Sequence, residues 1–272
     1  MSSSLTYVYC LVRSSRRPSL RGVAEPVPGS ETVRLLDVPL VASNERRASG
    51  PRHWLVVSTV PSAVYGERSL ERDLQNLDWV GSRALAHEQV IEHFLTADAV
   101  LPMQLFTLFN SDARAVDHVL ANRRRLAKVL LKVERQLEWG LRLMWDPAAI
   151  AADKRSGARR TGRRDGHRVV SGSEYLTRKR DLRDRSRTQL KRAKSDANRL
   201  YRAIAGEASQ ALRRTDVERA LPGSRLLLEA AFLVPVRRAR AFRAAVNRHT
   251  TGLEQSGIAV SLTGPWPPYN FI

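Results

Sequence analysis

The chain has 272 residues, a net charge of +19 and 43% apolar residues. This length corresponds to about two average domains, and the apolar fraction is sufficient for folded cores. The single cysteine, Cys10, excludes an internal disulfide and any zinc or iron–sulfur centre built on paired thiolates. No apolar run reaches the ~18–20 residues that cross a bilayer, and no secretory signal is recognisable. We therefore expect a cytoplasmic protein without membrane contact.

The first half of the chain predicts an N-terminal α+β domain over residues 1–135. Residues 5–13 (LTYVYCLVR) predict a strand buried on both faces, and residues 33–43 and 53–61 predict a hairpin. A helix with Leu70, Leu74 and Leu77 on one face is expected to end at Gly81. The second helix, the next strand and the long helix that follow are expected at residues 82–95, 99–109 and 112–137. Strands and helices without strict alternation favour a mixed sheet with helices on one face.

Residues 136–272 predict a second α+β domain. A strand at residues 137–145 precedes a flexible basic loop (151–170) and a very long helix (171–214). A strand, a helix and a last strand follow, at residues 225–236, 237–251 and 257–266. This order is close to the ferredoxin-like split unit, with the long helix as an arm.

No catalytic or cofactor motif is recognisable. His87 and His93 are six residues apart and so lie on different faces of a helix, which favours a hydrogen-bonded core role for His87 over zinc binding. Phosphate-binding glycine loops and a nucleophile elbow are missing from the sequence. Glu229 lies in an apolar strand, where a salt bridge explains it better than general-base catalysis. We expect no enzymatic activity, no metal and no cofactor.

The positive charge is concentrated in residues 151–200, which hold 17 basic and six acidic residues, a net charge of +11. This segment can neutralise phosphates on a nucleic acid, or it can be a solvated loop and helix face. Tyr175 is its only aromatic residue, whereas single-strand binders stack bases on several aromatics, so nucleic acid is the less favoured partner. The candidate basic patch consists of Arg159, Arg160, Arg163, Arg164, Arg178, Lys179 and Arg180.

The last residues, SLTGPWPPYNFI, combine three prolines with Trp266, Tyr269 and Phe271. Prolines hold such a segment extended, without a helix or a sheet ladder. It can dock on its own fold or serve as a hook for a partner. Docking on its own fold is favoured because exposed apolar patches are costly, and it predicts a buried Trp266 with a hydrogen-bonded indole. Tyr175 is a further candidate for such a clamp or partner contact.

Several segments, in this order, resemble the gas vesicle protein F/L family. They are YVYCLV, LDWVGSRALAHEQVIEHFL, AVLPMQLFTLF, LEWGLRL, GSEYLTRKR, LEAAFLV and LTGPWPPYNF. The resemblance implies a non-enzymatic, two-domain accessory protein that is needed to build gas vesicles and associates with them. It further implies contact with the small hydrophobic shell protein during nucleation, and with other gas vesicle accessory proteins. We expect the N-terminal half to capture the shell protein. The alternative is a nucleic-acid-binding regulator that uses residues 151–200.

Overall fold

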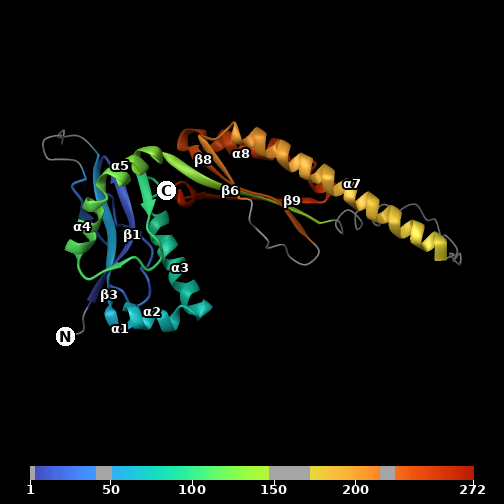
Figure 1. The fold of residues 1–272 in the computed structure, drawn as a ribbon. Helices are drawn as coiled ribbons and strands as arrows, with labels where there is room; N and C mark the ends of the chain where they lie inside the picture. Colours follow the sequence, from blue (N-terminus) through green and yellow to red (C-terminus); the bar gives the residue numbers. More distant parts are fainter. Residues whose placement is uncertain (1–3, 41–50, 147–171, 215–223) are drawn as a thin grey trace. The chain divides into compact units, whose positions relative to one another are not determined.

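The computed structural model describes residues 4–40, 51–146, 172–214 and 224–272 (Figure 1). The chain divides into two compact units. The first comprises Met1–Glu138 together with Pro265–Ile272, and the second comprises Trp139–Gly264. This division differs from the expected one because the C-terminal tail, Pro265–Ile272, belongs to the first unit and not to the second.

An antiparallel sheet forms the centre of the first unit. Its strands are β1 (Ser4–Ser14), β2 (Arg34–Asp37), β3 (Arg52–Pro61), β4 (Ala99–Pro102) and β5 (Leu108–Phe109). Their order is β2-β3-β1-β4, and β5 also pairs with β1. All the pairings of these strands are antiparallel, where a mixed sheet was expected. Strand β1 is therefore central, as its apolar sequence predicts.

Helices cover both faces of this sheet, so the expectation of helices on one face is wrong. Tyr7 and Tyr9 of β1 pack with residues of α3 (Leu77–Glu92), whereas Val8 and Leu11 pack against α4 (Asp112–Ala121) and α5 (Arg123–Lys132). Figure 1 shows α3 and α4 on opposite sides of β1 and β3. The physical reason is that β1 and β3 are apolar on both faces, and each apolar face must be covered. The short helices α1 (Ser62–Tyr65) and α2 (Glu67–Asp73) precede α3.

Three element boundaries differ from the expected ones. Helix α3 is capped by the side chain of Asn76 and continues through Gly81, which was expected to end it. The predicted strand at 99–109 is split into β4 and β5, and Phe106 between them has a φ of 63°. The predicted long helix at 112–137 is interrupted at Asn122, between α4 and α5. A single glycine costs too little to end a capped helix, and the interruptions at Phe106 and Asn122 are not visible in the apolar pattern that predicted continuous elements.

The second unit has the ferredoxin-like βαββαβ order, which confirms the predicted α+β class. Its elements are β6 (Gln136–Trp145), α7 (Gly172–Ala205), β7 (Gln210–Arg214), β8 (Arg225–Pro235), α8 (Ala239–Thr250) and β9 (Ile258–Trp266). The strand order is β7-β8-β6-β9. Strand β7 was expected to be the end of the long helix. The helix stops before Gly206, and the residues after it pair antiparallel with β8.

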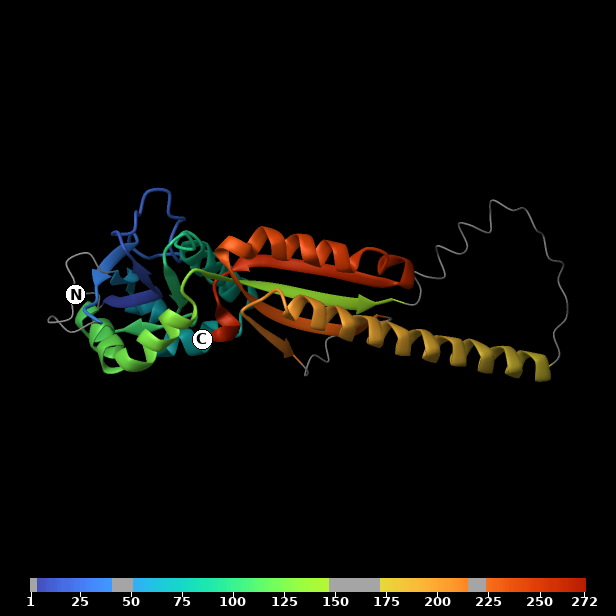
Figure 2. The same cartoon turned by 90° about the horizontal axis from the view of Figure 1, so that it is seen from above.

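One face of the second sheet packs against α7 and α8. The core unites Trp139, Leu141 and Leu143 of β6 with Ala197 and Leu200 of α7, among other residues. Among the α7 side chains that the structure describes, those in this core come from the C-terminal half of the helix. Its residues 179–181, 183–184 and 186–188 are exposed, and Figure 2 shows this part of the helix continuing beyond the strands. The predicted helical arm is therefore present within α7.

Candidate partner-binding surface

A buried hydrogen-bond network fixes the inner face of α3. The Nδ1 atom of His87 lies 2.9 Å from the Tyr7 hydroxyl, and its Nε2 atom lies 3.2 Å from the carbonyl oxygen of Met103. Burial lowers the pKa of His87 to about 4, so the imidazole is neutral at physiological pH. The interpretation of His87 as a hydrogen-bonded core residue is confirmed. Because these hydrogen bonds orient the inner face of α3 toward the sheet, they also determine which residues lie on its outer face.

The outer face of α3 carries an apolar stripe, which we define as Leu77, Gly81 and Leu85. These residues are four positions apart and therefore lie along one side of the helix. Leu77 is 84% exposed and Leu85 is 60% exposed. A Cβ atom added at Gly81 would meet no other atom within 4 Å. The two leucines, about 12 Å apart along the axis, thus stand on either side of a gap. Leu74, at the end of α2, is also exposed.

Acidic residues surround the α3 stripe. By the helical repeat, Asp78, Glu88 and Glu92 lie on the same side of α3 as the leucines. Residues 67–92 hold six acidic and three basic residues, a net charge of −3 in a chain of +19. Asp78 and Glu92 are exposed, and Glu88 is half-buried. The stripe is therefore apolar with an acidic rim, in a chain whose overall net charge is +19.

The C-terminal tail is clamped onto the first unit by buried groups. Glu138 is only 4% exposed, and its Oε2 atom accepts a hydrogen bond of 2.8 Å from the backbone N–H of Asn270. The side-chain amide of Asn270 donates to the other carboxylate oxygen. The ammonium group of Lys132 donates to the carbonyl oxygen of Phe271 at 2.8 Å. The Phe271 ring is buried as well. The hydrogen bonds to both carboxylate oxygens of Glu138 and the buried ring of Phe271 therefore attach the tail to the first unit.

Tyr269 joins this clamp to α3. Its hydroxyl donates a hydrogen bond of 2.7 Å to the Oε2 atom of Glu88, three residues beyond Leu85. Burial raises the pKa of the Glu88 carboxyl group, while the bond from Tyr269 opposes that shift. Burial, together with the Glu88 carboxylate, also raises the pKa of Tyr269. The tail therefore ends beside the α3 stripe and holds Glu88, one residue of its acidic rim, in place.

Trp266 is not part of the buried clamp, so the prediction of a buried indole is wrong. Its side chain is 37% exposed. Trp266 is the last residue of β9, which lies at the edge of its sheet and includes Pro265. Proline is tolerated at a sheet edge, so the expectation that this segment forms no ladder is also wrong. The residues after the strand, Pro267 and Pro268, are the ones that are buried.

The structure brings together only some of the candidate residues. Tyr269 and Phe271 meet in the tail clamp, and Lys179 and Arg180 are exposed on α7. The side chains of Tyr175, Arg178 and the four candidate arginines of residues 159–164 lie outside the described residues. Glu229 forms the expected salt bridge, at 2.7 Å from Arg142.

Within the described part of the chain, no group of three or more His, Cys, Asp or Glu residues is placed to hold a metal ion. None of the described helices combines the length and apolar character needed to span a membrane.

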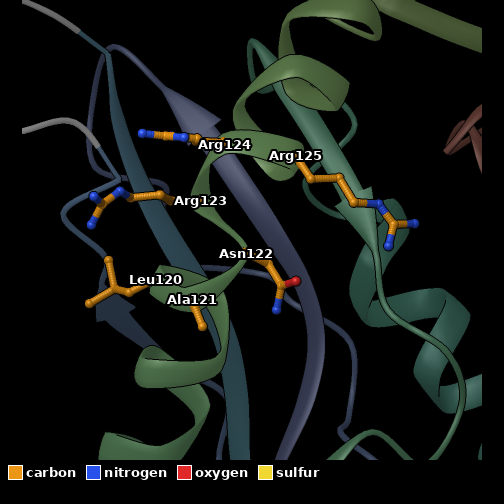
Figure 3. Close-up of a pocket in the computed structure, with 6 residues that line it drawn as sticks. All are labelled: Leu120, Ala121, Asn122, Arg123, Arg124 and Arg125. Atoms are coloured by element: carbon orange, nitrogen blue, oxygen red, sulfur yellow. The ribbon is translucent and has the colours of Figure 1, made fainter.

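A hollow of about 500 Å³ lies at the junction of α4 and α5. It is lined by Leu120, Ala121, Asn122, Arg123, Arg124 and Arg125. Figure 3 shows that Arg123 and Arg124 extend to one side, whereas Arg125 extends to the other. The guanidinium groups do not converge on one point, so this hollow lacks the geometry of an anion site.

The fold and this surface define a class of protein: an α+β protein of two units that presents a helix face and a clamped tail. The chain belongs to the gas vesicle synthesis protein GvpL/GvpF family, whose model matches residues 5–272. This places it among proteins that take part in gas vesicle formation and associate with gas vesicles, in a family that is not known to be enzymatic. The resemblance recognised in the sequence is thereby confirmed.

Individual relatives agree with this assignment. Gas vesicle protein L of Streptomyces sp. (strain CB03234) is 29% identical over 219 residues, which cover 79% of this chain and 78% of the relative. The crystal structure of GvpF from Anabaena sp. PCC7120 has a TM-score of 0.62 at 16% identity, over 99% of this chain and 96% of that one. The structure of GvpF from Microcystis aeruginosa has a TM-score of 0.57 at 13% identity, over 99% and 98%. These two structures support the fold.

The α3 stripe was not recognised in the sequence. Leu77 was placed on one helix face with Leu70 and Leu74, in a helix expected to end at Gly81, whereas Leu77 and Leu85 both lie exposed on α3. The helical repeat carries the missing signal, since Leu85 lies about 200° from His87 whereas Val90, Ile91 and Phe94 lie on the His87 side. Two apolar faces on one helix indicate that one faces the core and the other is free.

Proposed function

We propose that this protein is a non-enzymatic accessory factor that binds the small hydrophobic shell protein during gas vesicle assembly, and that it does so with its first unit. Membership of the GvpL/GvpF family supports a role in gas vesicle formation. The α3 stripe supports a protein-binding surface on the first unit. Leu77 and Leu85 are large, apolar and held in the open by a helix whose inner face is fixed. Exposed apolar clusters with a polar rim are typical of protein–protein contact sites.

The chemistry of the partner fits this surface. A shell subunit must remain apolar where it meets other subunits, so before assembly it exposes surface that another protein must cover. By the same proposal, other gas vesicle accessory proteins are further partners. The tail clamp serves stability in this account, since Tyr269 and Phe271 are engaged within the first unit.

The test is binding of the full-length chain to a solubility-tagged shell subunit from the same gas vesicle gene cluster. We expect a complex that survives high salt and that is weakened by Leu85→Asp. The matched control is Leu131→Asp, because Leu131 is also 60% exposed but lies on α5, which packs on the other face of the sheet. Failure of the unaltered chain to bind the shell subunit at any salt concentration would refute the proposal.

A second candidate function rests on the exposed basic half of α7. Lys179, Arg180 and Arg183 point away from the core of the second unit, as a phosphate-binding face would. Binding of a nucleic acid through this face would fall steeply with salt, because each neutralised phosphate releases counterions. A salt titration with a labelled duplex therefore separates this candidate from apolar capture of the shell protein.

A further inference from the structure

The shape and charge of the α3 stripe define its ligand more narrowly. The stripe offers side chains only, since the backbone hydrogen bonds of a helix are satisfied internally. A partner strand adds to an exposed sheet edge, which α3 does not provide. A partner helix, in contrast, places apolar side chains between those of the helix it meets. The open space at Gly81, between Leu77 and Leu85, leaves room for one such side chain.

The acidic rim adds a charge requirement. Asp78 and Glu92 are exposed beside the leucines, and Glu88 is held at the same side by Tyr269. A helix that buried its apolar face here would place its flanking residues against these carboxylates. Basic flanks would be attracted and acidic flanks repelled. The preferred ligand therefore has an apolar face bordered by Lys or Arg.

We propose that the α3 stripe binds one amphipathic helix of the shell protein, with an apolar side chain of that helix in the Gly81 gap and its basic flanks against Asp78 and Glu92. This inference rests on the proposed function, and it names the segment of the partner that is recognised. A second copy of this chain is the competing occupant. Its α5 also combines an exposed leucine, Leu131, with basic residues.

The deciding variant is Gly81→Leu, measured by calorimetry with the tagged shell subunit and with peptides that tile its sequence. A new leucine fills the gap, so we expect affinity to fall roughly tenfold or more. Nonspecific apolar adhesion would instead strengthen, because the variant adds apolar surface. The side chain meets no neighbour within 4 Å at its Cβ, so the fold tolerates it, and circular dichroism verifies this. Gly81→Ala is the small control.

The charge requirement is tested with the double variant Asp78→Lys and Glu92→Lys. We expect affinity for the shell subunit to fall and the preference for basic peptides to disappear. The control is Asp117→Lys, an exposed position of α4 on the other side of the sheet.

The outcomes separate the two proposals. Shell binding that is unchanged or tightened by Gly81→Leu overturns the helix-in-gap model but leaves the proposed function standing. Self-association of the chain in sedimentation, lost in Leu85→Asp, assigns the stripe to a second copy and also overturns this inference. If the chain binds neither the shell subunit nor any of its peptides, the proposed function itself is refuted. Binding of one basic, helix-forming peptide that competes with the whole subunit supports the inference.

Discussion

Replacing Phe271 with alanine tests how the tail is attached. Phe271 is 7% exposed, and the two residues before it, Asn270 and Tyr269, donate hydrogen bonds to Glu138 and Glu88. Loss of a buried phenylalanine typically costs about 3–5 kcal/mol of unfolding free energy. Because the tail can detach instead of leaving a cavity, we expect the low end, about 3 kcal/mol. At roughly 2–4 °C per kcal/mol for a unit of this size, the melting temperature should fall by about 6–12 °C.

The comparison with Trp266→Ala makes this prediction specific. Trp266 is 37% exposed, so its replacement should cost about 1 kcal/mol, clearly less than Phe271→Ala. Ile272→Ala, at an exposed terminal position, should be near neutral. The assay is thermal unfolding by circular dichroism together with a denaturant titration of each variant. We assign Phe271 as the residue that anchors the tail. A larger loss of unfolding free energy for Trp266→Ala than for Phe271→Ala would refute this assignment.

Three further predictions concern residues inside the first unit. Burial lowers the pKa of His87 from 6.5 to about 4. Between pH 6.5 and pH 4, His87 is therefore protonated in the unfolded chain but neutral in the folded chain. Stability should therefore fall by about 3 kcal/mol as pH drops from 6.5 to 4, and a His87→Gln variant with a pH dependence as steep as the original would contradict this. Gly81→Ala should raise stability by about 0.5–1 kcal/mol, because the site is an open helix interior; a lower denaturation midpoint would argue against that geometry. Cys10 is fully buried and burial raises its thiol pKa, so it should react with a thiol reagent only after unfolding; rapid labelling of the native protein would be the opposite result.

The sequence predicted the strands well where apolar content was high. The strand at residues 5–13 corresponds to β1, and those at 53–61 and 137–145 correspond to β3 and β6. Such segments are predicted correctly because β-branched and aromatic residues favour a buried strand over other secondary structure. The same two-sided apolar pattern in β1 implied helices on both faces, but that consequence was missed.

Long helical patterns were the weaker part of the prediction. The pattern over residues 171–214 continued through Ala208 and Leu212, yet the chain turns after Ala205 and forms β7. A short segment such as Gln210–Arg214 becomes a strand because β8 lies beside it, which is a tertiary effect. Gly81 shows the converse, since a single glycine in a well-capped helix costs only about 1 kcal/mol and did not end it.

Part of the site could be predicted because it depends on residue type. The packing of the tail on its own fold was expected from its prolines and aromatics, and the structure places Tyr269 and Phe271, two of the candidate residues, in the tail clamp. Their partners could not be named, because Glu88 and Glu138 are far from them in sequence and come close only through the fold. The exposure of Leu77 depended likewise on which face of α3 meets the sheet.

The central claim is that the α3 stripe meets the shell protein, and site-specific photo-crosslinking in cells that form gas vesicles tests it most directly. A photoreactive amino acid replaces Leu85 in one variant and Leu131, equally exposed on the other side of the sheet, in the other. Adducts are identified by mass spectrometry. The account predicts a crosslink from position 85 to a helix of the shell protein and none from position 131. Shell adducts from position 131 alone, or none from position 85 in cells that form vesicles, would contradict it.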